Sequence, residues 1–214
     1  MSAMEGVVLY DYWRSSAAYR VRIALALKRI AYRRIPVDLT AGEHRTAGHL
    51  ALNPMGRVPV LRIDGLVLSQ SLAIIGYLDE TRPACPLLPE SPGDRARVRA
   101  IALTVACDIH PVSNLSVLHR VEALAGAQAR ARWNRDNIAE GLTAVERMLD
   151  HPGFTGRFCH GDGPTLADCV LIPQVYNADR WGVSLQDMPR IRQVREHCNG
   201  LDAFRSAAPI DPAA

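Results

Sequence analysis

The sequence predicts two domains, a small α/β domain followed by an all-helical domain. Short strand and helix patterns alternate up to about residue 83, whereas only helical patterns occur in the second half. Between the two halves lies the proline-rich stretch Pro83–Gly93. Prolines at this density cannot continue a helix and favour extended backbone. We therefore expect an α/β domain over residues 5–83, a linker over 84–93 and a helical domain over 94–210.

The bulk composition is that of an ordinary globular protein with a buried core. Hydrophobic residues make up 48% of the 214 residues, charged residues 22%, and the net charge is +3. Scattered arginines carry the positive charge, since Lys28 is the only lysine. Nucleic-acid binding would require a concentrated basic stripe with interleaved aromatic residues, and the sequence has none. A small anionic substrate remains compatible with this charge.

Cysteine usage and hydropathy predict a cytoplasmic protein outside the membrane. The five cysteines are odd in number and form no CxxC pair, so neither a disulfide framework nor a metal site is indicated. Residues 1–6 lack the basic and apolar regions of a signal peptide. No segment approaches the roughly 20 apolar residues that a membrane-spanning helix needs.

The first element pattern predicts a parallel βαβ unit. Residues 6–10 form a short apolar run that is typical of a buried strand, and residues 31–37 predict a second strand. Ser15 or Ser16 can cap the intervening helix, because a serine hydroxyl accepts a hydrogen bond from a main-chain amide of the first turn. The helix has a broad apolar face: Val21, Ile23, Ala24, Leu25 and Leu27. The polar segment 39–52 predicts a loop with a short helix.

Residues 60–68 give the strongest hairpin signal. Two apolar runs flank Asp64 and Gly65, and an Asp-Gly pair suits the type I′ turn that joins antiparallel strands. The pair Gln70-Ser71 then opens a further helix. The first half therefore reads as βαβ, a loop and ββα.

The second half contains helical patterns alone. Thr165–Asp168 fits the pattern of a Ser or Thr followed three residues later by an acid, which begins many helices. Pro189 and Pro209 mark later breaks. Apolar side chains recur at helical spacing in two stretches: Val98, Ile101, Ala102, Val105 and Ile109, and Ile138, Leu142, Val145 and Leu149. These patterns predict a helical bundle.

The order βαβ followed by ββα resembles that of a thioredoxin-like domain, whose chemistry lies at the N-terminus of its first helix. Free amides and the helix dipole stabilise an anion there. This position reads Arg14-Ser15-Ser16 and contains no cysteine, so the protein's own sulfur cannot exchange disulfides at it. A serine hydroxyl can instead donate a hydrogen bond to a thiolate that a cofactor brings. In the simpler interpretation, Ser15 and Ser16 only cap the helix.

The first half of the chain contains two further motifs. A thioredoxin-like fold keeps a proline such as Pro59 cis, which leaves the main chain of Val58 open to a peptide-like ligand. The Gln70-Ser71 pair at a helix start can hold an α-carboxylate. A serine, a Val-Pro and a Gln-Ser in this order resemble the glutathione site of cytosolic glutathione transferases. The segment Thr165–Asp168 resembles the capping box of their second domain.

Longer segments narrow the resemblance to the zeta class of that family, over residues 8–208. The segments are Ser15-Ser16 with Arg20–Leu25, Ala51–Pro54, Gln70–Ile75 and Asn114–Leu118. The resemblance implies the glutathione transferase fold, a thioredoxin-like domain plus an all-α domain, with glutathione as cofactor and a homodimer as the assembly. The chain departs from the class at Ala17 and Tyr19, where a Cys and a Trp often stand. The missing Cys removes the protein thiol that a reductive dehalogenation would need.

The resemblance also implies roles for individual residues of the first domain. Ser15, with Ser16 beside it, would be the catalytic partner of the thiolate. The main chain of Val58 would pair with the cysteinyl part of glutathione. Gln70 and Ser71 would hold its γ-glutamyl end.

The remaining implied contacts come from both halves of the chain. His44 would contact the glycyl end of glutathione, and Arg14 and Arg180 would bind the carboxylates of a substrate. Three residues would line the helical-domain wall of the glutathione site: His110, Asn114 and Ser116. Without the resemblance, the two histidines fit surface or interface positions equally well, and Asn114 fits a plain helix start.

The implied activity is glutathione-dependent cis–trans isomerisation of a maleyl diketo acid. The leading expectation is conversion of maleylacetoacetate to fumarylacetoacetate in tyrosine and phenylalanine breakdown, by thiolate addition, bond rotation and elimination. Maleylpyruvate isomerisation is an alternative, although its relatives tend to carry an extra Arg where this chain has Leu115-Ser116. A general conjugating transferase is a third candidate. A non-catalytic binding module of this family is the fourth, and it predicts a degraded thiol site.

Overall fold

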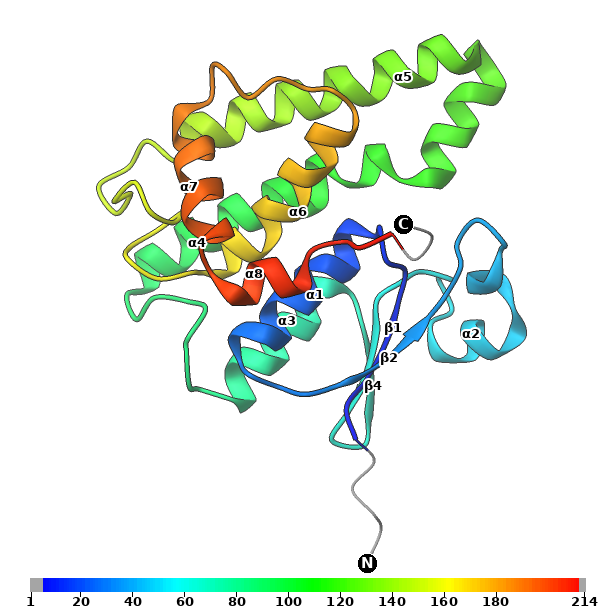
Figure 1. Cartoon of the computed structure of the whole chain (residues 1–214), viewed down its shortest axis with the longest axis horizontal. Helices are drawn as coiled ribbons and strands as arrows, with labels where there is room; N and C mark the ends of the chain where they lie inside the picture. The colour runs from blue at the N-terminus through cyan, green and yellow to red at the C-terminus, as the bar shows by residue number, and fades with distance from the viewer. Residues whose placement is uncertain (1–5, 212–214) are drawn as a thin grey trace, which may run out of the picture. The chain divides into compact units, whose positions relative to one another are not determined.

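The computed structural model describes residues 6–211, which divide into two compact units (Figure 1). Unit 1 comprises the residues up to Pro86 together with those from Asp202 onward, and unit 2 is Leu87–Leu201. The predicted helical domain, 94–210, differs from this division at its C-terminal end. The reason is that helix α8 (Asp202–Ala207) packs against helix α1 (Ser16–Leu27) of unit 1.

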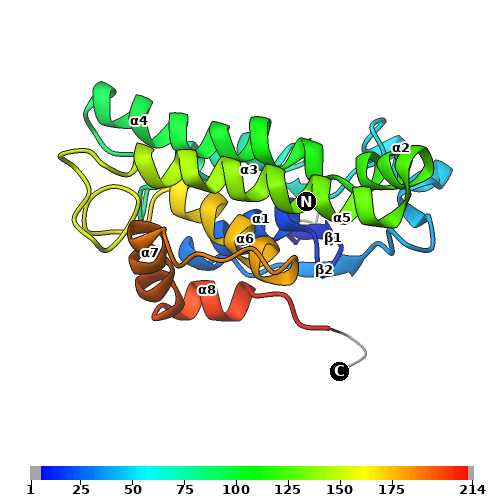
Figure 2. The same ribbon diagram turned by 90° about the horizontal axis from the view of Figure 1, so that it is seen from above.

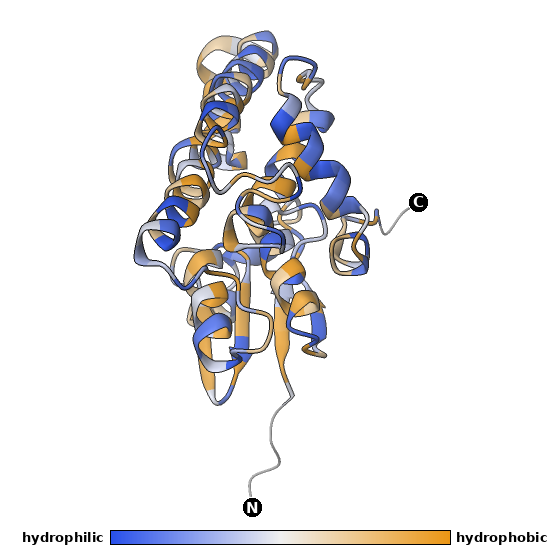
Figure 3. Ribbon diagram, turned by 90° about the vertical axis from the view of Figure 1, so that its left-hand side faces the viewer, coloured by the Kyte–Doolittle hydropathy of each residue, from blue (hydrophilic) through white to orange (hydrophobic). Residues whose placement is uncertain are grey.

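Unit 1 is built on a four-stranded sheet in the order β2-β1-β3-β4. Its strands are β1 (Val8–Asp11), β2 (Arg33–Pro36), β3 (Val60–Ile63) and β4 (Leu66–Ser69). Strand β1 pairs in parallel with β2 and antiparallel with β3, and β3 and β4 form an antiparallel hairpin. Most residues of β1, β3 and β4 are hydrophobic, and strands of this sheet are orange in Figure 3. The predicted βαβ and ββα units are therefore confirmed.

The turn between β3 and β4 has the backbone conformation that its Asp-Gly pair predicts. The φ angles are 53° at Asp64 and 77° at Gly65, both in the left-handed region that a type I′ turn requires. Helix α3 (Ser71–Thr81) holds this turn from one side, since the Tyr77 hydroxyl donates to Asp64 Oδ2 over 2.6 Å. The guanidinium of Arg82 donates to the other oxygen, Oδ1, over 2.8 Å.

The helices of unit 1 bury their apolar faces as the sequence pattern predicts. Helix α1 packs against α3 and α8, and its residues from Ala18 to Leu25 are buried. The loop between β2 and β3 contains a short 3-10 helix, η1 (Glu43–Arg45), and helix α2 (Ala47–Leu52). The short helix expected in segment 39–52 is therefore present.

Unit 2 is a helical bundle around α6. Helix α6 contacts α4, α5 and α7, which Figure 2 shows from above together with α6. It is buried along most of its length. Thr165 and Asp168 form the predicted capping box at its start. Among the described residues of unit 2, the regular elements are α4 (Pro92–Leu103), η2 (Thr104–Ile109), η3 (Pro111–Ser113), α5 (Leu115–Met148), α6 (Leu166–Arg180) and α7 (Pro189–Asn199).

Three features of unit 2 depart from the sequence pattern. Helix α4 begins at Pro92, inside the predicted linker, because Ser91 caps it and proline is tolerated in a first helical turn. The apolar stripe expected to continue this helix instead runs into a π-helical segment, η2. Helix α5 is kinked at Gly126, whose φ of 86° and ψ of 171° lie outside the helical region. Only glycine adopts that conformation readily.

Among residues 6–211, no single helix is both long enough and apolar enough to cross a membrane. The bent pair Pro92–Ser113 and Leu115–Met148 meets the length and composition requirement only when the two are joined.

Candidate active site

The site residues predicted in unit 1 lie in segments that leave the sheet at one edge. The cross-strand register places Tyr10, Val60 and Ser69 in one row. The end of β1, the start of β3 and the end of β4 therefore coincide at this edge. The segment with Ser15 follows β1, the segment with Val58 precedes β3, and α3 begins directly after β4. The topology brings these three segments together although they are far apart in the sequence.

Ser15 is the N-cap residue of α1, as the sequence predicts. Its Oγ accepts a hydrogen bond from the amide of Ala18 over 3.2 Å, and its own amide donates to the carbonyl of Tyr12 over 2.9 Å. Because Oγ acts as an acceptor in the cap, the hydroxyl hydrogen can be donated to an anion in front of the helix. Ser16 is the first residue of α1 and, like Ser15, is half-buried.

Arg14 directly precedes the cap and lies against aromatic rings. Its guanidinium carbon is 5.5 Å from the centre of the Trp13 ring and 6.0 Å from that of Tyr12. A guanidinium over a ring face is held by cation–π attraction and keeps its hydrogen-bond donors for other partners. The Tyr12 and Trp13 rings therefore hold Arg14 in place as a half-buried cation next to Ser15.

Val58 is buried in a small apolar cluster with Tyr12 and Val37, so it lies beside the residues that lead to Ser15. The peptide bond between Val58 and Pro59 is cis, as predicted. The strand ladder begins at Val60, which places the main chain of Val58 outside it. This segment is thus positioned by packing, while its main chain lies beyond the paired part of the sheet.

Two residues that the sequence analysis missed hold the chain just before Val58. The side-chain amide of Asn53 donates to the carbonyl of Arg57 over 2.9 Å, and His49 Nε2 lies 3.0 Å from the same oxygen. Both side chains are buried. Asn53 belongs to a segment that carries the family resemblance, but no sequence pattern indicated its contact with a carbonyl four residues later.

His44 lies in η1, close to the loop before β3. A Cβ added to Gly56, which has a φ of 58°, would lie 2.9 Å from the His44 carbonyl oxygen. Only glycine therefore allows this approach. Burial, and then the nearby charges of Arg45, His49 and Arg57, lower the pKa of His44. Within the described part of the chain, its buried Nδ1 has no hydrogen-bond partner.

Gln70 and Ser71 start α3 with an unusual backbone. Gln70, the N-cap residue, has a φ of 68° and a ψ of 112°, a region that non-glycine residues occupy at a cost of order 1–3 kcal/mol. Ser71 is buried, and its Oγ accepts a hydrogen bond from Nη1 of the buried Arg20 over 3.3 Å. Strain of this kind is frequent where a main chain is shaped for a ligand.

The other predicted residues lie in unit 2. His110 connects η2 to η3, Asn114 is the N-cap residue of α5, and Ser116 lies in its first turn. Arg180 is on a different helix, in the last turn of α6, with its guanidinium carbon 5.9 Å from the centre of the Tyr176 ring. His110, Asn114 and Ser116 are therefore neighbours because they are close in the sequence. Their contacts with a ligand remain predictions.

Known proteins match this chain over nearly its whole length. Residues 5–80 match the family "Glutathione S-transferase, N-terminal domain", and residues 127–200 match "Glutathione S-transferase, C-terminal domain". The maleylacetoacetate isomerase of Rhizobium meliloti strain 1021 is 60% identical over 204 residues, which cover 94% of this chain and 95% of that protein. A maleylpyruvate isomerase, described as a bacterial zeta-class enzyme, superimposes with a TM-score of 0.92 at 44% identity, covering 97% of this chain and 99% of that one. The chain belongs to the zeta class of glutathione transferases.

A third relative of this transferase carries ligands. The maleylacetoacetate isomerase of Methylobacterium extorquens AM1, solved with malonate and glutathione bound, has a TM-score of 0.91 and 42% identity over 97% of this chain and 99% of that one. The glutathione transferase fold and the zeta-class resemblance predicted from the sequence are confirmed by these matches.

Proposed function

We propose that this zeta-class transferase is a glutathione-dependent maleylacetoacetate isomerase, which converts maleylacetoacetate to fumarylacetoacetate. The observation that carries the proposal is the 60% identity to the Rhizobium meliloti isomerase along nearly the full length of both chains. The geometry of unit 1 supports it, because Ser15 caps the amide end of α1, and the N-terminus of a helix stabilises an anion such as a thiolate.

The residues of unit 1 fit glutathione, a peptide-like anion with a carboxylate at each end. The main chain of Val58, outside the strand ladder, suits pairing with the cysteinyl unit. The strained start of α3 at Gln70 and Ser71 suits the γ-glutamyl end, and His44 suits the glycyl end. These assignments are proposals, which the unpartnered Nδ1 of His44 and the strain at Gln70 support.

Bound glutathione supplies a thiolate whose reversible addition turns the cis double bond into a rotatable single bond. Ser15 contributes a hydrogen bond that stabilises the anionic sulfur, together with the amides at the start of α1. Arg14 offers a guanidinium, held over Trp13, for a substrate carboxylate. We assign Arg180 to the second carboxylate, and His110, Asn114 and Ser116 to glutathione binding.

Absorbance assays test the proposed reaction. Maleylacetoacetate and maleylpyruvate are each incubated with the protein, with and without glutathione, and the loss of the cis isomer is followed. We expect glutathione-dependent turnover of both, with the higher kcat/KM for maleylacetoacetate. A higher kcat/KM for maleylpyruvate would favour the second candidate function, which the close superposition on a maleylpyruvate isomerase supports. Retention on immobilised glutathione without turnover would identify a binding module.

A homodimer is also part of the proposal. Unit 1 exposes apolar side chains, with Met55 63%, Leu66 44% and Val67 47% exposed, and the last two lie on β4 at the edge of the sheet. Light scattering should then give about twice the chain mass of 23.5 kDa. A monomeric mass that does not change with concentration would contradict the dimer. The cytoplasmic location remains a prediction.

A further inference from the structure

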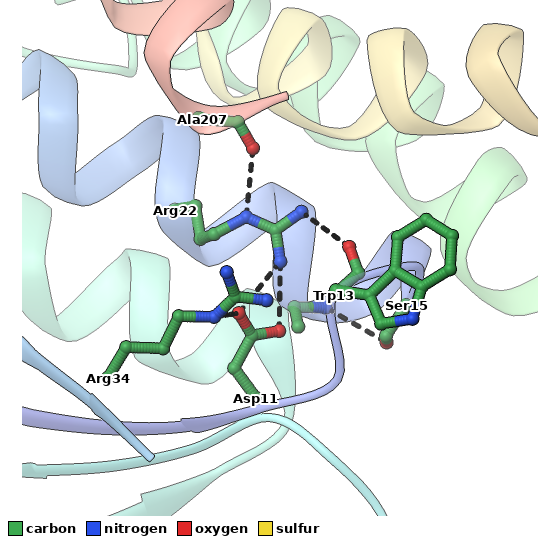
Figure 4. Close-up of polar contacts among 7 residues, drawn as sticks. Asp11, Trp13, Ser15, Arg22, Arg34 and Ala207 are labelled. Atoms are coloured by element: carbon green, nitrogen blue, oxygen red, sulfur yellow. Dashed lines mark hydrogen bonds and ion pairs between the residues drawn. The ribbon is translucent and has the colours of Figure 1, made fainter. Parts of the chain in front are cut away.

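One buried arginine in α1 binds three separate segments of unit 1 (Figure 4). Arg22 is 4% exposed, and its Nη1 donates to both oxygens of Asp11 over 2.8 and 2.9 Å. Its Nη2 donates to the carbonyl of Trp13 over 3.1 Å, and its Nε donates to the carbonyl of Ala207 over 2.8 Å. Every nitrogen of the guanidinium therefore has a partner.

These three partners surround the loop that leads to the proposed thiolate site. Asp11 is the last residue of β1 and is fully buried, and the Trp13 carbonyl lies two residues before Ser15. Ala207 is the last residue of α8. The planar fork of one side chain thus fixes the loop of residues 12–15 relative to both the strand before it and the C-terminal helix.

A tyrosine reinforces the attachment of α8. The Tyr19 ring lies under the guanidinium, with its centre 5.2 Å from the Arg22 carbon, and its hydroxyl donates to the carbonyl of Phe204 over 3.4 Å. Tyr19 stands where zeta-class enzymes often have Trp. In this chain, α1 therefore holds two carbonyls of α8 through neighbouring side chains, Tyr19 and Arg22.

A second cation reaches the same carboxylate from the outside. Arg34 on β2 is 39% exposed, and its Nε lies 2.5 Å from Asp11 Oδ2. Arg22 and Arg34 carry equal charges on one carboxylate, but the hydrogen bond to the loop carbonyl comes from Arg22. Substituting each arginine in turn therefore separates the effect of losing a positive charge beside Asp11 from the effect of losing the hydrogen bond to the loop.

We propose that Arg22 is a positioning residue for the isomerase. By holding the Trp13 carbonyl, it keeps the hydroxyl of Ser15 and the amides of the first turn of α1 directed at the sulfur. The inference rests on the proposed role of Ser15. Misplacement of a catalytic group by about 1 Å can cost orders of magnitude in rate. A lysine would keep the charge beside Asp11 but cannot reproduce three directed contacts.

The test compares Arg22→Lys with Arg34→Met, and uses Ser15→Ala as the reference for a lost thiolate contact. Three quantities are measured: kcat, the KM for glutathione, and the apparent pKa of the bound thiol from its thiolate absorbance. For Arg22→Lys we expect kcat to fall roughly tenfold, the KM to stay within about twofold and the thiol pKa to rise by about one unit. Arg34→Met should retain all three wild-type values.

A second variant keeps the inference testable if Arg22→Lys does not fold. Asp11→Asn with Arg22→Gln removes both buried charges together, so it leaves no unpaired ion in the interior. The inference is overturned if a folded Arg22 variant has wild-type kcat and thiol pKa, or if Arg34→Met reproduces its effects. A different result would show that the proposed function is wrong. In that case the wild-type protein would not catalyse the isomerisation, or Ser15→Ala would be fully active.

Discussion

Nη1 of Arg20 donates a hydrogen bond to Oγ of Ser71 over 3.3 Å, which ties α1 to the first residue of α3. Both side chains are buried, so the bond orients a hydroxyl that is proposed to contact the γ-glutamyl carboxylate. The same helix therefore supports two parts of the proposed glutathione site: the sulfur through its N-cap residue Ser15, and the γ-glutamyl end through Arg20.

Arg20→Met should weaken glutathione binding more than turnover. The variant loses a buried cation and the hydrogen bond that orients Ser71, which together should cost about 1–2 kcal/mol of binding, or roughly a five- to thirtyfold higher KM. Steady-state kinetics with varied glutathione measures the change. Arg33→Met, an exposed arginine on β2, is the matched control and should behave as wild type. A lower kcat with an unchanged KM would contradict the assignment.

Ser15→Ala should lower kcat about a hundredfold while changing the KM for glutathione little. One preorganised donor to a developing anion is typically worth 10²–10³ in rate. The variant also loses its cap on α1, which should cost about 1 kcal/mol of stability. Ser91→Ala removes the equivalent cap of α4 and is the control for that second effect. If the two variants were equally active, Ser15 would be a cap alone.

Gly56→Ala should destabilise the protein and weaken glutathione binding together. The added methyl group would face the His44 carbonyl at 2.9 Å on a backbone with a φ of 58°, which should lower the free energy of unfolding by about 2 kcal/mol. Gly48→Ala, in α2, meets no atom within 4 Å and should be neutral or stabilising. Urea unfolding of both variants measures the difference, and equal stabilities would show that the loop near His44 can relax.

Replacing the strained Gln70 by glycine should stabilise the backbone but weaken glutathione binding. Gln70→Gly and Gln70→Ala both remove the amide, so both should raise the KM for glutathione. Only glycine relieves a φ of 68°, and the glycine variant should therefore be more stable than the alanine variant by about 1 kcal/mol. Chemical denaturation of the pair isolates the backbone contribution. An alanine variant as stable as the glycine variant would argue against strain.

His151 should make unit 2 sensitive to acid. Its Nδ1 accepts from the amide of Gly153 over 3.1 Å, and its Nε2 lies 3.0 Å from the Cys159 carbonyl, so the neutral ring satisfies both contacts. Burial is the main cause of its lowered pKa, Arg97 and His160 lower the pKa further, and the Cys159 bond and Asp94 oppose the shift. The unfolded chain therefore takes up this proton more readily.

This contribution is fully present above pH 6.5 and is lost as the pH falls through the lowered pKa. His151→Asn keeps an acceptor for Gly153 and should flatten the decline of unfolding free energy as the pH falls below 6.5. His197→Asn, at an exposed position, should leave the decline as in wild type. If the unfolding free energy of His151→Asn fell with pH as steeply as that of wild type, other titratable groups would be responsible for the decline.

Local signals in the sequence predicted much of the fold. The Asp64-Gly65 turn, the Ser15 cap and the capping box at Thr165 each depend on a few neighbouring residues, and all three are present. Apolar spacing also identified Ile138, Leu142, Val145 and Leu149 as core positions, and all four are fully buried. These features are encoded within one or two turns of chain.

Features that depend on distant contacts were not predicted. Nothing near Arg22 in the sequence indicates that it binds the carbonyl of Ala207, 185 residues away. The kink at Gly126 and the π-helical segment η2 interrupt otherwise regular helical patterns, and the apolar spacing did not predict either of them. The residues of the proposed site were found from short motifs, whereas the buried groups that hold them, such as His49 and Arg20, were not.

The return of α8 to unit 1 has a consequence for the order of events during translation. Residues up to Pro86 are synthesised before unit 2, whereas the carbonyls that Tyr19 and Arg22 bind are synthesised after it. Unit 1 therefore cannot complete its packing until the segment that follows unit 2 has been synthesised. Unit 2 has been synthesised in full by that time, although its synthesis begins after that of residues up to Pro86.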